Sequence, residues 1–233
     1  MNGLLVRVGA DNSSGSWNGP IDVASRKFAY VAIPESSPVH PGFEKPYAAL
    51  TPLLTQFGVE LPPHLRARHM HLDPDFEQLT YGDQGERAKQ LQSNLSAGDL
   101  VVFYAGLADR RRAQLVYGLI GLFVVARIVP AVDIPAKDRD LNAHSRRILR
   151  RDAKDLIVSA RKSLSGRFDR CLPIGEFRDR AYRVKRDILE AWGGLSVKDG
   201  YIQRSARLPR LLDPPRFLRW LEGQRVNLVA ANN

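Results

Sequence analysis

Two long apolar runs joined by a short basic loop constrain the fold of this chain more than any other feature. Residues 99–104 and 116–125 are rich in β-branched and aromatic side chains, which is typical of strands, and residues 109–112 connect them. The pair predicts a β-hairpin at the centre of the core. Gly118 and Gly121 interrupt the second run, and glycines inside a strand indicate a bulge or a bend, so we expect a curled or barrel-like sheet.

Shorter segments around this hairpin suggest further elements. Residues 4–8 and 28–33 have the composition of strands and are expected to be related as a hairpin, and residues 155–159 predict another strand. Apolar residues at three- and four-residue steps predict a helix over residues 177–192. The tail, residues 227–233, is expected to fray.

Asp83 and Glu86 have the spacing of a capping box, and they predict the start of a helix. Together these elements predict a single α+β domain over residues 1–233. Its sheet is mixed or antiparallel, with flanking helices. Residues 1–135 form the sheet-rich part with the polar loops, and residues 136–233 form a basic, mainly helical part.

The charge of the chain is unevenly distributed along the sequence. Residues 1–108 contain 8 Lys and Arg against 11 Asp and Glu, a net charge of −3, whereas residues 109–233 contain 27 against 14, a net charge of +13. A basic half of this kind attracts polyphosphate whatever its fold. It therefore indicates a nucleic acid or nucleotide partner, although a solvated basic surface explains it too.

The sequence also indicates where the protein works. Residues 1–7 do not resemble a secretory leader, and the longest apolar run, 115–125, is about half of the roughly 20 residues that a membrane helix needs. We therefore expect a cytoplasmic protein without a membrane span. Cys171 is the only cysteine, which excludes an internal disulfide and a cysteine-rich zinc site.

Residues 69–83 form the densest polar segment and contain two histidines and four acids. In an extended chain, alternate side chains share a face, so His71 and Asp73 would lie together. Imidazoles and carboxylates of this kind bind a divalent metal or act as acid–base groups. We predict catalytic roles for Asp73 and His71, and also for Asp75 and Asp83, with turn bonding and helix capping as the alternative explanation.

Other polar residues are candidates for binding a substrate. The loop after the first expected strand contains Asp11, an acid–base candidate, and Trp17 could stack on a base or cover the core. His144 beside Arg146 and Arg147 favours phosphate contact over metal binding, because neighbouring cations oppose another cation. The complete set of predicted binding residues is Trp17, Asn18, Tyr81, Tyr104, His144, Arg146, Arg204 and Arg207.

Several familiar motifs are absent from the sequence. It contains no Walker-type phosphate loop, no dinucleotide-binding glycine fingerprint, no zincin helix and no nucleophile elbow. Their absence argues against ordinary ATPases, dehydrogenases, zincin proteases and α/β-hydrolases.

Short motifs spread over nearly the whole chain resemble the nucleotide modification associated domain 3 family. They are residues 8–11 with 15–20, 71–76 with 80–83, 98–107, 142–144 and 200–205. The resemblance implies an α+β domain found with systems that make or handle modified DNA bases. It implies no settled catalytic residues, so the site residues above rest on their own chemistry.

A second, weaker similarity concerns the central hairpin and residues 173–177, which resemble PUA-like domains of the EVE and ASCH groups. This similarity implies a barrel that holds flipped or unpaired bases in a pocket.

These observations predict a protein that modifies or processes bases in nucleic acid or nucleotides, and they favour DNA over RNA as its partner. A non-catalytic reader of modified bases and a scaffold subunit of a modification or defence complex are the alternatives. The sequence leaves open whether the protein is an enzyme and whether a divalent metal is its cofactor.

Overall fold

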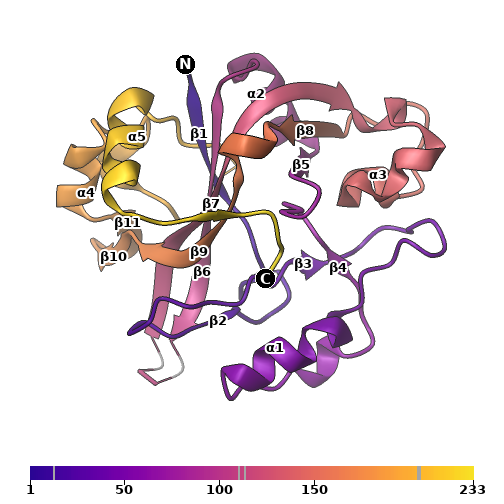
Figure 1. Ribbon diagram of the computed structural model, residues 1–233, viewed down its shortest axis with the longest axis horizontal. Coiled ribbons are helices and arrows are strands. Elements are labelled where there is room, and N and C mark those ends of the chain that lie inside the picture. The colour runs from indigo at the N-terminus through magenta and orange to yellow at the C-terminus, as the bar shows by residue number, and fades with distance from the viewer. Residues whose placement is uncertain (13, 110, 113, 204–205) are drawn as a thin grey trace.

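A mixed β-sheet forms the centre of the molecule (Figure 1). The computed structural model describes residues 1–233 except 13, 110, 113, 204 and 205. The sheet runs in the order β1-β6-β7-β8-β5. In addition, β2 pairs with β6, β9 pairs with β7, and β12 pairs with β9. Its eight strands are β1 (Gly3–Arg7), β2 (Pro20–Ile21), β5 (Thr80–Asp83), β6 (Leu100–Asp109), β7 (Gln114–Pro130), β8 (Leu156–Ala160), β9 (Gly166–Pro173) and β12 (Leu228–Val229).

The predicted central hairpin is confirmed. β6 and β7 pair antiparallel, and their register shifts between Phe103 and Tyr104, which leaves Ile120 of β7 without a partner and places the predicted bulge between Gly118 and Gly121. A Cβ atom at Gly121 would lie 2.8 Å from the backbone oxygen of Gly166, so only glycine allows β9 to approach β7 this closely. The α+β class is confirmed, but the described strands form an open path rather than a closed barrel.

The expected pairing of the first strand is wrong. β1 pairs parallel with β6. Of residues 28–33, Phe28 forms an isolated bridge with Ile21, and Ile33 belongs to β3 (Ile33–Pro34), which pairs antiparallel with β4 (Met70–His71). β1 lies at one end of the strand order and is still buried along most of its length. Its other edge is covered by residues 209–211, where the backbone N–H of Leu5 donates to the carbonyl oxygen of Pro209 at 2.8 Å.

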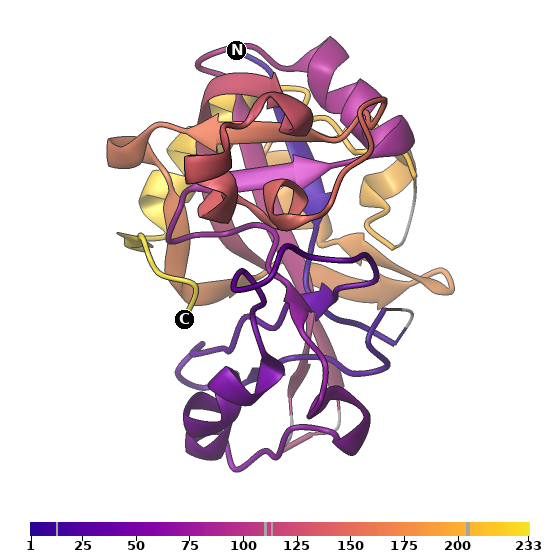
Figure 2. The ribbon, with the colours of Figure 1, turned by 90° about the vertical axis from the view of Figure 1, so that its right-hand side faces the viewer.

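The sheet separates two apolar cores, as the alternation along β6 shows. Val101 and Phe103 belong to one core, and Val102 and Tyr104 belong to the other. In Figure 1, α4 and α5 cover one side of β7, while α1 and α3 lie on the other side. Figure 2 shows β5 and α3 above α1 from that second side. The helices are α1 (Thr51–Gln56), α2 (Gly85–Asn94), α3 (Ala143–Arg146), α4 (Arg186–Ala191) and α5 (Pro214–Gly223).

The helix predicted over residues 177–192 is largely wrong. The hairpin β10 (Gly175–Arg178) and β11 (Ala181–Val184) occupies its first part, and only α4 is helical. The turn residues Asp179 and Arg180 both adopt positive φ. Glycine or asparagine usually indicates such a turn in a sequence, and neither occurs at these two positions. The basic part of the chain therefore contains many strands, and β8 confirms the one predicted there.

Two predictions about element ends are also wrong. Asp83 is the last residue of β5 and does not cap α2, whose N-cap is Gln84, because Asp83 instead contacts Tyr81 and Arg87. The tail does not fray, since Asn232 accepts a hydrogen bond from the backbone N–H of Phe76 at 2.8 Å. No helix in the described parts of the chain has the length and apolar character that crossing a membrane requires.

Candidate functional site

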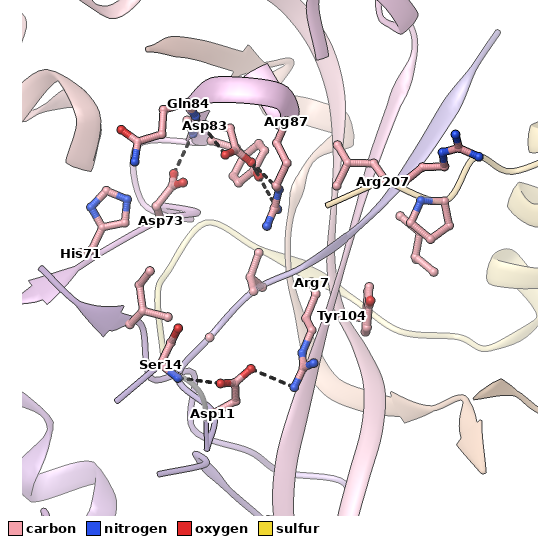
Figure 3. A pocket seen from close by; sticks show the side chains of 18 of the residues that line it. Arg7, Asp11, Ser14, His71, Asp73, Asp83, Gln84, Arg87, Tyr104 and Arg207 are labelled. Atoms are coloured by element: carbon pink, nitrogen blue, oxygen red, sulfur yellow. Dashed lines mark hydrogen bonds and ion pairs between the residues drawn. The ribbon is translucent and has the colours of Figure 1, made fainter. Parts of the chain in front are cut away.

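A cavity of about 290 Å³ opens beside β1, and its walls come from distant parts of the chain. Figure 3 shows His71, Asp73 and Asp83 on one wall and Asp11 with Arg7 on another, with Tyr104 and Arg207 beyond them. Eight of the predicted site residues line this cavity: Asp11, His71, Asp73, Tyr81, Asp83, Tyr104, His144 and Arg207.

The short β3–β4 pairing positions His71. Ile33 is its partner in the register, and Glu35 lies just beyond the end of β3. The Nδ1 atom of His71 lies 2.6 Å from the Glu35 carboxylate, and both side chains are buried. Because a carboxylate can only accept, Nδ1 carries a proton and donates a hydrogen bond to Glu35, and in the neutral ring Nε2 is then an acceptor.

Two donors hold Asp73 in place. The backbone N–H of Gly82 and the side-chain amide of Asn142 each donate to Asp73 Oδ1 at 2.8 Å. The second oxygen, Oδ2, lies 3.9 Å from Nε2 of His144. A Cβ atom at Gly82 would overlap the His144 ring and lie 2.7 Å from Oδ1 of Asn142, so glycine is needed for β5 to approach this histidine.

His144 lies on α3, one turn of helix that a capping box stabilises. The Asn142 side chain accepts from the His144 N–H, and Ser145 completes the capping box. The Nδ1 atom of His144 lies 2.6 Å from Asp155, which precedes β8, and therefore donates to it. The rings of His144 and His71 meet edge to face with their centroids 4.8 Å apart.

Arg147 bridges the two carboxylates behind the histidines. Its Nη2 atom lies 2.8 Å from Glu35, and its Nη1 atom lies 3.8 Å from Asp155. Burial would raise the pKa of Glu35, but the hydrogen bonds from His71 and Arg147 outweigh burial and hold this pKa below its usual value. The pKa of Asp155 is lowered in the same way, chiefly by the hydrogen bond from His144 against the effect of burial.

Burial is the largest cause of the pKa shifts of His71 and Asp73, which both line the cavity. Burial lowers the pKa of His71 and raises the pKa of Asp73, because a charged form loses solvation in either case. The His71 ring is therefore neutral at pH 7. A neutral imidazole beside a buried carboxyl group can accept a proton or bind a metal ion.

Three further guanidinium groups line the cavity, those of Arg7, Arg87 and Arg207. Arg7 forms an ion pair with Asp11 at 2.8 Å, and Arg87 forms one with Asp83 at the same distance. Arg207 lines the cavity from an exposed position. Each guanidinium has five N–H donors, so an ion pair with one carboxylate leaves donors for a further anion.

The remaining predicted residues lie elsewhere. Asp75 and Arg146 form a buried ion pair at 2.6 Å beside a different cavity. Trp17 packs against the core, and Asn18 donates to the backbone oxygen of Gly106, so neither side chain lines the cavity near His71. Arg204 lies outside the described residues, as does Arg110 of the basic hairpin loop.

Both arginines that follow His144 have carboxylate partners, since Arg146 pairs with Asp75 and Arg147 pairs with Glu35. Tyr81 and Tyr104 line the cavity, but their side chains are buried, at 2% and 3% exposure.

Sequence reasoning missed the two carboxylates behind the histidines, and it named Arg147 only as a cation beside His144. Glu35 lies in an irregular segment, and the sequence indicates Asp155 only as the start of a strand. Glu35 lies 36 residues from His71 in the sequence, so only the tertiary fold brings them together. The one local signal was the motif around Asn142 and His144, which does contribute to the site.

The fold and the cavity define an α+β protein with a buried imidazole–carboxylate cluster open to one pocket. The sequence profile of the nucleotide modification associated domain 3 family matches residues 2–199, and the chain belongs to this family. The family description associates the chain with nucleotide modification. No curated protein and no solved structure matches the chain.

Proposed function

We propose that the cavity beside β1 binds a nucleotide or a base of nucleic acid, and that His71, Asp73 and His144 act on it chemically. One observation carries this proposal: the three side chains meet in the same cavity that Arg7 and Arg87 line. Guanidinium groups hold phosphate, and the imidazole–carboxylate cluster provides groups for acid–base or metal chemistry on the base. The cavity volume of about 290 Å³ is at the lower end of small-molecule sites.

Catalysis explains the cluster better than simple recognition of a base. Glu35 and Asp155 fix the tautomers of both histidines, as acid–base and metal chemistry require. The half-buried ring of Tyr201 also lines the cavity and offers the stacking surface that Tyr81 and Tyr104 do not. DNA is favoured over RNA because the family resemblance associates the chain with modified DNA bases.

The test is nucleoside mass spectrometry of DNA, RNA and free nucleotides from cells whose chromosomal gene is deleted. The deleted cells receive the wild-type gene, the Asp73→Asn variant, the Glu77→Gln variant or no gene. Asparagine keeps the Oδ1 acceptor for Gly82 and Asn142 but removes the carboxylate. Glu77 is exposed on the same loop outside the cavity and provides the matched control. We expect a nucleoside that depends on the wild-type and Glu77→Gln genes and disappears with Asp73→Asn.

Binding of oligonucleotides to the purified proteins separates the alternatives. A reader of modified bases would leave all nucleosides unchanged, and Asp73→Asn would alter which base is preferred. Phosphate contacts release counterions, so either nucleic-acid function makes the affinity fall steeply with salt. Unchanged nucleosides together with no salt-sensitive binding of oligonucleotides would reject both base modification and the reading of modified bases. That result would favour a scaffold subunit of a modification or defence complex.

A further inference from the structure

Three ligand-type atoms converge at the inner end of the cavity. One atom each from His71, Asp73 and His144 lies within 4.8 Å of the other two. Tetrahedral metal bonds of about 2.1 Å place ligand atoms about 3.4 Å apart, so each side chain needs to move inward by less than about 1 Å. All three side chains are at most 7% exposed, so the protein and not bulk water surrounds the point between them.

The hydrogen bonds from the His71 and His144 rings to carboxylates match those made by metal-binding histidines. In protein metal sites, a ligating histidine donates its other ring N–H to a carboxylate or carbonyl, which fixes the tautomer and raises the basicity of the ligand nitrogen. Both rings have this arrangement, with Nδ1 of His71 and of His144 each 2.6 Å from a carboxylate oxygen. An acid–base dyad needs one such histidine, whereas two of them around one carboxylate make a ligand set.

We propose that His71, Asp73 and His144 bind one divalent first-row transition-metal ion such as Zn²⁺, with an open coordination position toward the cavity. Two imidazoles and one carboxylate suit zinc or iron, whereas Mg²⁺ and Ca²⁺ prefer oxygen ligands alone. Three protein ligands and an open position are the usual arrangement of a metal that acts on a substrate. The inference deepens the proposed function and rests on it for the nucleotide that the ion would face.

The test measures metal binding directly. The full-length protein is treated with a chelator, checked for folding by circular dichroism, and titrated with Zn²⁺, Co²⁺ and Mg²⁺. We expect one Zn²⁺ or Co²⁺ ion per chain, visible absorption from the bound Co²⁺, no competition by Mg²⁺, and a rise in melting temperature with Zn²⁺. His71→Gln should abolish Zn²⁺ and Co²⁺ binding, the Co²⁺ absorption and the rise in melting temperature. Asp155→Asn should weaken Zn²⁺ affinity about 10- to 100-fold, because it removes the carboxylate that accepts the hydrogen bond from Nδ1 of His144.

The matched control is His69→Gln, because His69 is exposed and lies two residues before His71. It should bind Zn²⁺ as the wild type does. The proposal is overturned if the folded wild-type protein takes up no stoichiometric Zn²⁺ or Co²⁺, or if His71→Gln binds them equally well.

Nucleotide binding is measured on the same preparations. Nucleotide binding by a protein that takes up no Zn²⁺ overturns the metal site alone. Zn²⁺ uptake without any nucleotide binding supports the metal site and counts against the proposed function.

Discussion

Removal of Arg147 tests whether the ion pair between Arg147 and Glu35 is buried and contributes to stability. Its Nε and Nη2 atoms donate to the same Glu35 oxygen at 3.0 and 2.8 Å, and the two side chains are only 7% and 5% exposed. Arg147→Met removes the positive charge but keeps much of the side-chain volume. Glu35 and Asp155 then lose their shared guanidinium while both remain buried.

The expected cost follows from the burial of the pair. Breaking a buried ion pair by removing one partner typically costs about 3–5 kcal/mol, because the other charge stays buried. For a chain of this length, that loss lowers the melting temperature by roughly 6–20 °C. Urea unfolding followed by fluorescence, with a chelator present to remove metal ions, measures the loss at equilibrium.

Two further variants make the result decisive. Arg150→Met is the control, since Arg150 pairs with Asp152 at 88% and 76% exposure and should have little effect on stability. Adding Glu35→Gln to Arg147→Met removes the stranded carboxylate, and the two changes should couple by about 0.5–3 kcal/mol. A loss no larger than that of Arg150→Met, or strict additivity in the double variant, would refute the buried network.

Two more predictions concern the core. Phe76 is fully buried, and its ring lies edge-on to Tyr30, Phe103 and Phe123, so Phe76→Ala should lower the free energy of unfolding by about 3–5 kcal/mol in urea titrations. A loss below about 1 kcal/mol would contradict its place in the core. Cys171 is also fully buried, and burial raises the pKa of its thiol, so a thiol reagent should react with it only after unfolding. Rapid reaction of the native protein would contradict this placement.

The central sheet could be predicted from the sequence because its strands are long and apolar. The hairpin of β6 and β7 needs no partner from elsewhere to be recognised, and its glycines indicate the bend. The pairing of β1 could not be predicted in this way, because its partner, β6, lies more than 90 residues away. The hairpin of β10 and β11 was hidden for a different reason, since its apolar spacing also fits a helix.

The site was predictable in part. His71 and Asp73 share a short segment, and their alternation indicated a common face, which the cavity agrees with. Asp75 continues that pattern in sequence, but its side chain lies beside Arg146 in another cavity. Glu35 and Asp155 have no local signal, because a single acid in an irregular segment has the same appearance wherever its side chain points.

The residues that line the cavity extend from Leu5 to Pro209 along the chain, and β1 reaches its place only by pairing with a strand that begins about a hundred residues later. Contacts between residues so far apart slow folding, because the long intervening segment must first be closed into a loop. A nascent chain that ends before β6 therefore lacks the wall that β1 forms. The phosphate contact proposed for Arg7 depends on both strands and is absent until both have been made.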